Sequence, residues 1–328
     1  MSHLVLSDLD LDAFTPGEIS KAWLRLASDG LGQPIRIPLI VARGSREGPV
    51  AGITAALHGN EVNGVPVIHR LFRKLDPNRL KGTILAVPVA NVPAYLLHQR
   101  RTDDGVDLNH VFPGRPVGRE AIVYANRLFD RVIRKMDVLL DLHTASLGRV
   151  NSLYVRADMR DPVTLHMAEL QRPQIIVHSP PADGTLRGAA GDVGIPAVTV
   201  EIGNPSRIHR EYVKRSVTGI RAVLADRGMV PRRELALTEP ALRCTRSEWV
   251  YTDSGGFLDV KVRVMELVEA GQEIATLTDP FGDLIRSYTA PYDGIVIGHS
   301  VDPVASTGAR ILHLGTLAKP GHPLAREE

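Results

Sequence analysis

Several features that define other classes of protein are missing from this sequence. The chain of 328 residues has a single cysteine, Cys244, which excludes an internal disulfide framework and a cysteine-rich zinc site. Its basic and acidic residues nearly cancel, 39 against 37, so the formal net charge is only +2. Such a balance does not indicate a nucleic-acid-binding protein or a protein with a strongly acidic partner.

Long hydrophobic runs are missing as well. No apolar stretch approaches the length that a membrane-spanning helix requires. Residues 1–8 have neither the charged start nor the apolar core of a signal peptide. A single thiol is typical of a protein from a reducing compartment. We therefore expect a cytoplasmic protein that makes no membrane contact.

Apolar runs and amphipathic segments alternate over the first two thirds of the chain. Buried strands are predicted at residues 35–42, 50–56, 82–89, 137–143, 152–156, 174–178 and 195–201. Helices are predicted at residues 17–26, 62–75, 120–136, 162–170 and 209–228. Pro38 suggests that the first strand lies at a sheet edge. The alternation predicts a three-layer α/β fold, in which a largely parallel mixed sheet has helices on both faces.

The pattern changes near residue 236. Beyond it the chain has short β-like runs and turns, and one spacing occurs twice. Gly, Ile and Leu follow one another at intervals of three residues, first as Gly271, Ile274 and Leu277 and then at residues 308, 311 and 314. Two such β-units are expected to pack as a small two-fold barrel sandwich. We therefore predict two domains, residues 1–236 and residues 237–328.

Three residues at the ends of predicted strands form a candidate metal site. His58 and Glu61 follow the strand at residues 50–56, and His143 ends the strand at residues 137–143. Open α/β sheets bind ligands beyond the carboxyl ends of their strands. Two imidazoles and one carboxylate form a Zn²⁺ ligand set that leaves a coordination position open for water. For each residue alone, a helix cap or a hydrogen-bonded core histidine is the alternative interpretation.

Catalysis by such a site needs a base. Glu201 ends the strand at residues 195–201, and its carboxylate is our candidate for the group that takes a proton from zinc-bound water. The alternative interpretation of this residue is a structural carboxylate or a helix cap.

The polar loop at residues 99–118 adds further candidates, namely Arg100, Arg101, Asp107, Asn109 and His110. Loops of this length inside a compact domain are usually functional or disordered. An arginine there can stabilise an oxyanion, and the Asn109 amide can hydrogen-bond a substrate carboxylate or carbonyl. The alternative interpretation of either arginine is a solvated surface charge.

Four short motifs carry a resemblance to a known family. Residues 58–61 (HGNE), 104–109 (DGVDLN), 141–144 (DLHT) and 199–203 (TVEIG) occur in the order and the context that the succinylglutamate desuccinylase/aspartoacylase family shows. That family belongs with the zinc carboxypeptidases. The resemblance spans most of the chain. It includes the C-terminal part, because many members of the family end in a lipoyl-like β domain.

The resemblance implies roles for individual residues. His58, Glu61 and His143 would bind one zinc ion per chain, Glu201 would activate the water, and Asn109 would help to seat the substrate. An arginine ahead of the Asp-Leu-Asn triplet would polarise the scissile carbonyl, and both Arg100 and Arg101 fit that description. Family members usually have an arginine directly after the triplet, where it binds a substrate carboxylate.

This sequence departs from the family at that last position. His110 stands where the arginine is usual, and an imidazole is shorter and cannot form the bidentate fork. The C-terminal turn at residues 279–283 also lacks the lysine that lipoyl and biotinyl carriers present. We therefore expect a lipoyl/biotinyl-like domain with a structural role, which caps the mouth of the active site or forms a homo-oligomer contact.

Together these observations predict a zinc-dependent hydrolase that cleaves the amide bond of a small N-acylated amino acid or amine. Its partner would be that small molecule, with no nucleic acid and no membrane involved. Two alternatives stay open. One is a metallocarboxypeptidase that acts on a peptide or amide C-terminus, and the other is a non-catalytic metal- or ligand-binding protein with the same fold.

Overall fold

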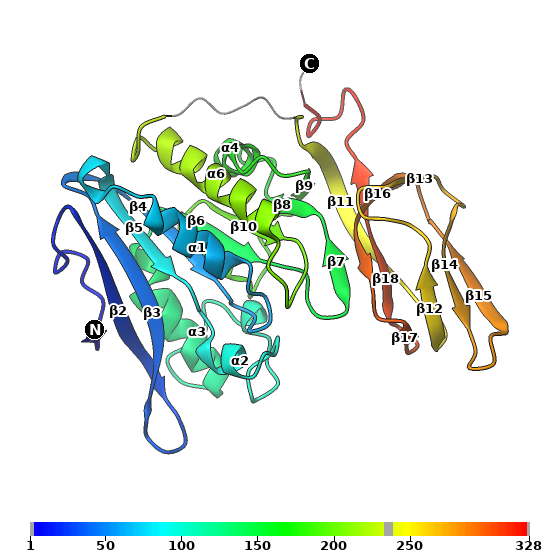
Figure 1. Cartoon of the computed structure of the whole chain (residues 1–328), viewed down its shortest axis with the longest axis horizontal. Coiled ribbons are helices and arrows are strands. Elements are labelled where there is room, and N and C mark those ends of the chain that lie inside the picture. Colours follow the sequence, from blue (N-terminus) through cyan, green and yellow to red (C-terminus); the bar gives the residue numbers. More distant parts are fainter. Residues whose placement is uncertain (1–2, 233–238, 327–328) are drawn as a thin grey trace.

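The computed structural model describes residues 3–232 and 239–326, and its centre is a mixed β-sheet of 14 strands (Figure 1). The strands before residue 232 are β1 (Leu4–Leu6), β2 (Glu18–Ser28), β3 (Pro34–Arg43), β4 (Arg46–Ala55), β5 (Lys81–Val87), β6 (Val138–His143), β7 (Arg149–Asn151), β8 (Leu153–Ala157), β9 (Ile175–His178) and β10 (Ala197–Ile202). The strands after residue 239 are β11 (Leu242–Tyr251), β12 (Gly256–Val260), β13 (Leu267–Val268), β14 (Glu273–Thr278), β15 (Leu284–Thr289), β16 (Gly294–Ser300), β17 (Val304–Ala305) and β18 (Arg310–Leu317).

The middle of the large sheet is parallel. Its strand order is β1-β2-β3-β5-β4-β6-β10-β8-β9-β11-β18-β16-β13, with β7 paired to β16. The neighbours β5, β4, β6 and β10 all run in the same direction. The strand β3 pairs antiparallel with β2 on one side and with β5 on the other. The prediction of a mixed sheet is therefore confirmed, but the sheet is parallel mainly at its centre and not largely parallel throughout. The carboxyl ends of β4, β6 and β10 consequently meet at one edge of the sheet.

Helices cover both faces of this sheet. The helices are α1 (Gly64–Arg73), α2 (Val92–Leu96), α3 (Glu120–Arg131), α4 (Pro162–Leu170), α5 (Leu186–Asp192) and α6 (Arg210–Asp226). In β6, Leu140 faces a core shared with α1, α4 and α6, whereas Leu139 faces a second core shared with α3 and α5. This alternation follows from the two-residue period of a strand. None of the helices in the described residues is long and apolar enough to cross a membrane.

Two details of the N-terminal part differ from the prediction. The segment predicted as a helix at residues 17–26 is the strand β2, in which Ala22, Leu24 and Leu26 are buried on alternate positions. A period of two residues places these side chains on one face of a strand, whereas a helix would scatter them. The strand β3 that contains Pro38 is not an edge strand, because it pairs with β2 on one side and β5 on the other.

The C-terminal part continues the large sheet. The strand β11 pairs with β9, and β18 and β16 extend the sheet beyond β11, while β15, β14, β12 and β17 form a second sheet of four strands. The strands of the described residues close no barrel, so the predicted barrel sandwich is not confirmed. The predicted domain boundary near residue 236 lies outside the described residues.

The repeated Gly-Ile-Leu spacing has a structural meaning nevertheless. Ile274 and Leu277 of β14 and Ile311 and Leu314 of β18 are fully buried in one hydrophobic core between the two C-terminal sheets. A second small core joins this region to the rest of the molecule, since it contains Cys244 of β11 together with buried residues of β8 and β9. The C-terminal part is therefore joined to the N-terminal part by side-chain packing as well as by strand pairing.

Candidate active site and metal centre

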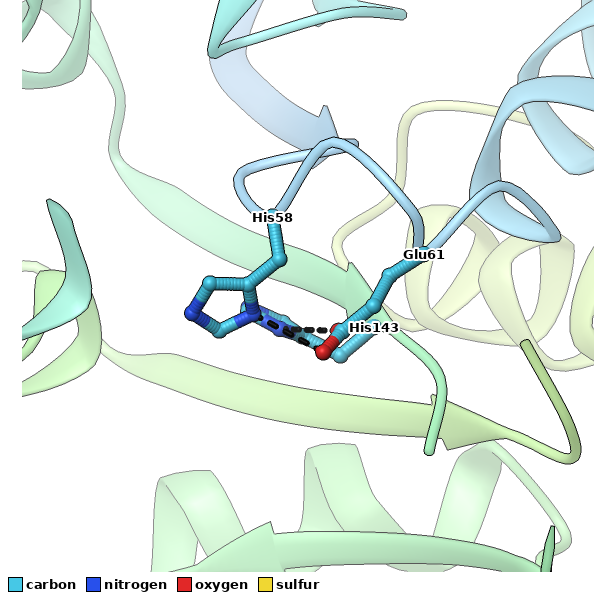
Figure 2. A group of neighbouring side chains, drawn as sticks. All are labelled: His58, Glu61 and His143. Carbon is cyan, nitrogen blue, oxygen red and sulfur yellow. Dashed lines mark hydrogen bonds and ion pairs between the residues drawn. The ribbon is translucent and has the colours of Figure 1, made fainter. Parts of the chain in front are cut away.

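The three expected metal ligands come together at the carboxyl ends of β4 and β6. His58 and Glu61 lie in the loop between β4 and α1, and His143 is the last residue of β6. Their side chains converge (Figure 2), with Glu61 Oε1 3.0 Å from His58 Nδ1 and Glu61 Oε2 3.0 Å from His143 Nδ1. One ligand atom from each residue lies within 4.8 Å of the other two, and all three residues are buried.

Close packing against α2 shapes the loop that carries two of these ligands. A β-carbon at Gly59 would overlap the backbone carbonyl of Ala94 in α2, so only glycine fits there. Asn91, which caps the start of α2, donates a hydrogen bond from its side-chain amide to the carbonyl of Leu57. The loop is thus anchored on both sides of His58, which directs His58 and Glu61 toward β6.

Carboxylates hold the outer nitrogens of both imidazoles. His58 Nε2 lies 3.0 Å from Asp107 Oδ1, and His143 Nε2 lies 2.7 Å from Asp141 Oδ2. The Thr54 hydroxyl donates to Asp141 Oδ1 at 2.6 Å, because the register of β4 and β6 pairs these two residues. When the outer nitrogen donates its proton to a carboxylate, the lone pair of the inner Nδ1 is left for a ligand. Metal-binding histidines are typically oriented in this way.

Electrostatics favour a cation at the centre of this group. Burial raises the pKa of Glu61, but the neighbouring His58 and His143 outweigh it and hold the pKa well below its usual value. The carboxylates Glu61, Asp107 and Asp141 surround two imidazoles, so the group has an excess of negative charge when the rings are neutral. A buried excess of this kind is stabilised by a divalent cation. Donor type, orientation and charge all fit a zinc ion.

The structure distinguishes the two arginines that the sequence left as equals. Arg100 Nη1 lies 3.0 Å from Glu61 Oε1, and Arg100 Nε lies 2.8 Å from Asp107 Oδ2. Its Nη1 also donates to the hydroxyl of Ser146 at 2.6 Å. Arg101 is exposed and reaches only the wall of the surrounding cavity. Arg100 is therefore the arginine beside the metal ligands.

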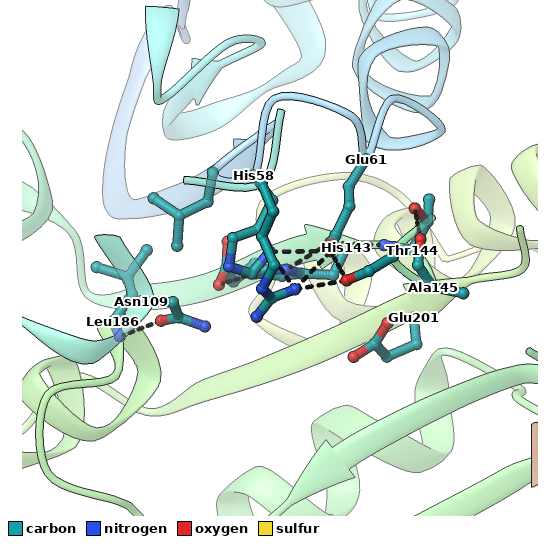
Figure 3. Close-up of polar contacts among 12 residues, drawn as sticks. His58, Glu61, Asn109, His143, Thr144, Ala145, Leu186 and Glu201 are labelled. Carbon is teal, nitrogen blue, oxygen red and sulfur yellow. Dashed lines mark hydrogen bonds and ion pairs between the residues drawn. The ribbon is translucent and has the colours of Figure 1, made fainter. Parts of the chain in front are cut away.

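The other loop candidates occupy different positions. Asp107 is largely engaged, because His58 shares Oδ1 with the backbone N–H of Asn109 and Arg100 holds Oδ2. The side-chain oxygen of Asn109 accepts a hydrogen bond from the backbone N–H of Leu186 at 2.8 Å (Figure 3). That bond fixes the orientation of the Asn109 amide, so its NH₂ group points away from the Leu186 backbone. The His110 side chain is 68% exposed and lies 3.7 Å from Asp107.

Glu201 lies next to His143, because β10 and β6 are parallel neighbours whose register pairs these two residues (Figure 3). Its side chain is only 12% exposed, and Arg156 Nε lies 3.7 Å from Oε1. Its second oxygen, Oε2, is buried and has no hydrogen-bond partner among the described residues. Burial raises the pKa of Glu201 against the opposing charge of Arg156. A carboxylate with an unused oxygen and a raised pKa has the properties of a general base.

All nine predicted site residues line one cavity of about 520 Å³. The sequence reasoning missed several others that line it, among them Arg149, Arg156, Arg187, Trp249 and Arg310. The last two belong to β11 and β18, so the C-terminal strands form part of the cavity wall. This agrees with the expectation of a C-terminal part that caps the site.

One missed residue had a signal in the sequence. Asp141 stands two positions before His143 in a predicted strand, and residues two apart in a strand point to the same face. That spacing identifies Asp141 as a partner of His143. The arginines and Trp249 had no comparable signal, because their positions depend on how distant strands pair.

Comparison with known proteins places the chain in a family. A sequence model of the succinylglutamate desuccinylase/aspartoacylase catalytic domain matches residues 47–227, which is more than half of the chain. The chain belongs to this family of hydrolytic deacylases. A similar protein is the N-alpha-acetyl-L-2,4-diaminobutyric acid deacetylase of Halomonas elongata, which is 28% identical over 274 residues, or 79% of this chain and 78% of that protein.

Solved structures show the same fold over nearly the whole chain. A succinylglutamate desuccinylase from a Silicibacter species superposes with a TM-score of 0.84 at 20% identity, covering 94% of this chain and 97% of that one. The product-bound ectoine utilization protein EutE (DoeB) from Ruegeria pomeroyi superposes with a TM-score of 0.82 at 22% identity, covering 91% and 95%. The likeness covers more than nine tenths of the chain, so these structures share its fold.

Proposed function

We propose that this chain is a zinc-dependent amidohydrolase that removes the acyl group from a small N-acylated amino acid. The observation that carries the proposal is the convergence of His58, Glu61 and His143, with a largely buried carboxylate, Glu201, on the adjoining strand. Membership of a deacylase family and similarity to a deacetylase of an N-acetylated diamino acid support the substrate class.

The metal is assigned to His58, Glu61 and His143. Each imidazole presents an inner nitrogen whose ring is held by a carboxylate, and Glu61 is ionised by its surroundings. A zinc ion bound there supplies a Lewis acid that polarises a carbonyl and makes water acidic near neutral pH. Three protein ligands leave a position open for that chemistry.

Glu201 is assigned as the general base. Its unpaired Oε2 accepts a proton from the attacking water, and the carboxyl group then gives that proton to the leaving nitrogen. Burial raises the pKa of Glu201 and so favours its neutral acid form, which makes the first of these transfers, from water to the carboxylate, easier.

Arg100 and Asn109 are assigned to the substrate. The guanidinium of Arg100 lies where it can stabilise the oxyanion that forms from the acyl carbonyl, as a fixed cation beside the metal ligands. The NH₂ group of Asn109 is free to donate to a substrate oxygen, since Leu186 occupies only its carbonyl oxygen. We assign Asp107 to positioning, because it orients both His58 and Arg100.

A panel of substrates tests this function. Purified full-length chain, loaded with zinc, is assayed for release of free amine from Nα-acetyl-L-2,4-diaminobutyric acid, N-acetylaspartate, N-succinylglutamate and short peptides. We expect release from at least one N-acyl amino acid and none from the peptides. Peptide turnover without deacylation would favour the metallocarboxypeptidase. Failure to bind zinc, together with no hydrolysis, would favour a non-catalytic binding protein.

A further inference from the structure

Two arginines and a tryptophan form a cluster on the cavity wall, at the junction with the C-terminal strands. Arg149 begins β7, Arg310 begins β18, and Trp249 lies in β11. The guanidinium carbons of Arg149 and Arg310 lie 5.3 Å and 5.1 Å from the centre of the Trp249 ring. The ring is itself stacked on the buried His313, with centroids 4.8 Å apart. The indole thus gives both guanidinium groups a fixed aromatic support.

Neither arginine has an acidic partner. Within residues 3–232 and 239–326, no carboxylate oxygen lies within 4.0 Å of Arg149 or Arg310, although most arginines near the site are engaged. Arg100 is bound to Glu61 and Asp107, and Arg187 donates to the Ser179 backbone and side chain. Arg149 is half-buried and Arg310 is exposed, so water screens part of the repulsion between the two guanidinium groups, and an anion between them would remove it.

The pKa of Arg149 reflects the charged groups near it, which include Arg310 and Arg100. Burial, and next the charge of Arg310, lower the pKa of Arg149, and the charges of Arg100, Glu61 and Glu201 also act on it. Arg149 and Arg310 are thus close enough to influence each other, and both line the cavity that contains the candidate metal ligands. Arg149 and Arg310 also line a second cavity together with Asp302, but among the described residues this carboxylate makes no ion pair with either arginine.

We propose that Arg149 and Arg310, supported by Trp249, form the subsite that binds the carboxylate of the substrate. The inference rests on the proposed function and names its specificity: an N-acylated amino acid is preferred over an N-acylated neutral amine. A carboxylate placed between the two guanidinium groups accepts charge-assisted hydrogen bonds from both and removes their repulsion.

This subsite explains how the chain can bind an acidic substrate with a histidine at position 110. His110 is largely exposed and has no fork of donors, so it cannot replace an arginine as a bidentate carboxylate ligand. Arg149 and Arg310 supply two forks from a different part of the cavity. Because Arg310 belongs to β18, the C-terminal part then contributes directly to substrate choice.

Matched substrates and variants test the proposal. The N-acyl amino acid that is hydrolysed best is compared with its own carboxamide, which lacks the negative charge, in the Arg149→Gln, Arg310→Gln and double variants. For the acid, we expect KM to rise about tenfold for each single variant and about a hundredfold for the double variant, with kcat little changed. For the carboxamide, KM should stay within about twofold of its original value. Arg310→Lys should recover part of the loss, because it restores the charge without the fork.

A matched control is Arg263→Gln, since Arg263 is exposed in the C-terminal part and does not line the cavity. This variant should behave as the unmodified chain does. Equal effects on acid and carboxamide, or no effect on either, would overturn the subsite while leaving the deacylase function intact. A chain that hydrolyses no N-acyl compound would overturn the deacylase function instead.

A binding measurement tests the subsite without catalysis. The chain has two tryptophans, so the Trp23→Phe background leaves Trp249 as the only indole. Nα-acetyl-L-2,4-diaminobutyric acid should change the Trp249 fluorescence of this protein with saturation, and its carboxamide should bind about tenfold more weakly or worse. The difference should vanish in the Arg149→Gln, Arg310→Gln double variant. A response to acid and carboxamide with equal affinity would contradict a carboxylate subsite.

Discussion

Two regions of one cavity differ in how completely their polar groups are paired. In the metal centre, both ring nitrogens of His58 and His143 and both oxygens of Glu61 have partners between 2.7 and 3.1 Å. At the junction with the C-terminal strands, Arg149 and Arg310 have an aromatic support but no acidic partner among the described residues.

The difference separates groups that are positioned before the substrate arrives from groups that wait for it. Arg149 is half-buried and Arg310 is exposed, so water can solvate their guanidinium groups, whereas a buried polar atom without a partner among the described residues, such as Glu201 Oε2, normally indicates the place of a ligand or water. Glu201 belongs to both kinds, because Arg156 lies near one oxygen while the other has no partner. The cavity thus has three parts in our proposal: a fully hydrogen-bonded candidate metal centre, a candidate base beside it, and a cationic wall formed by Arg149 and Arg310 on Trp249.

The largest expected effect comes from removing the base while leaving the metal centre intact. Glu201→Gln keeps the shape of the side chain but cannot accept the proton. We expect kcat to fall by about a hundredfold to ten-thousandfold, with zinc content unchanged. Glu47→Gln, at an exposed glutamate, is the control. Normal turnover by the Glu201 variant would mean that another residue is the base.

A smaller effect is expected at Asp141, which contacts the proposed metal ligand His143. Asp141→Asn weakens the hydrogen bonds that Asp141 accepts from His143 Nε2 and from the Thr54 hydroxyl, because a neutral amide replaces the charged acceptor. Zinc affinity should fall by about tenfold to a hundredfold, measured by competition with a chelator. Unchanged affinity would mean that the pairing of His143 does not prepare it for a metal.

A further variant weakens the hydrogen bonding around Glu61 and Arg100 without replacing a proposed metal ligand. Ser146→Ala removes the hydroxyl that contacts both Arg100 and Glu61. The loss of hydrogen bonds to these charged groups should lower kcat/KM by about tenfold and leave zinc binding intact. The measurement is steady-state kinetics with the best substrate, and a loss of zinc would instead assign Ser146 to the metal centre.

Another prediction concerns the strand β11, which contributes Trp249 to the cationic wall. We expect β11 to stay paired with the large sheet in the native protein. Cys244 of β11 is buried under the junction, and burial raises the pKa of its thiol to about 12. The native protein should therefore not react with a thiol reagent at pH 8, whereas the denatured protein should react fully. Rapid labelling of the native protein would mean that β11 separates from the sheet.

Much of the metal centre follows from the sequence, for a physical reason. His58, Glu61, His143 and Glu201 stand at the ends of apolar runs, and parallel strands bring their carboxyl ends to one edge of the sheet. The choice between Arg100 and Arg101 needed the loop conformation, which no periodic pattern predicts. The prediction of a helix at residues 17–26 also failed. The segment is a strand, and its composition alone did not distinguish a strand from a short helix.

The cationic wall was beyond the reach of the sequence. Arg149, Trp249 and Arg310 are separated by 100 and 61 residues along the chain, and they meet because β18 pairs with β11 on one side and with β16 on the other, while β16 also pairs with β7. The repeated Gly-Ile-Leu spacing correctly indicated a shared C-terminal core, but it did not show that the strands extend the large sheet. Long-range strand pairing leaves little local trace in a sequence.

The most direct test of the proposed zinc centre is a calorimetric titration of chelator-treated protein with zinc. We predict one tight site per chain, lost in His143→Ala and kept in His166→Ala, whose ring is half-exposed and paired with Asp226. A chain that binds no stoichiometric zinc, or a His143→Ala variant that binds it as tightly as before, would contradict the proposed metal centre and the hydrolysis that depends on it.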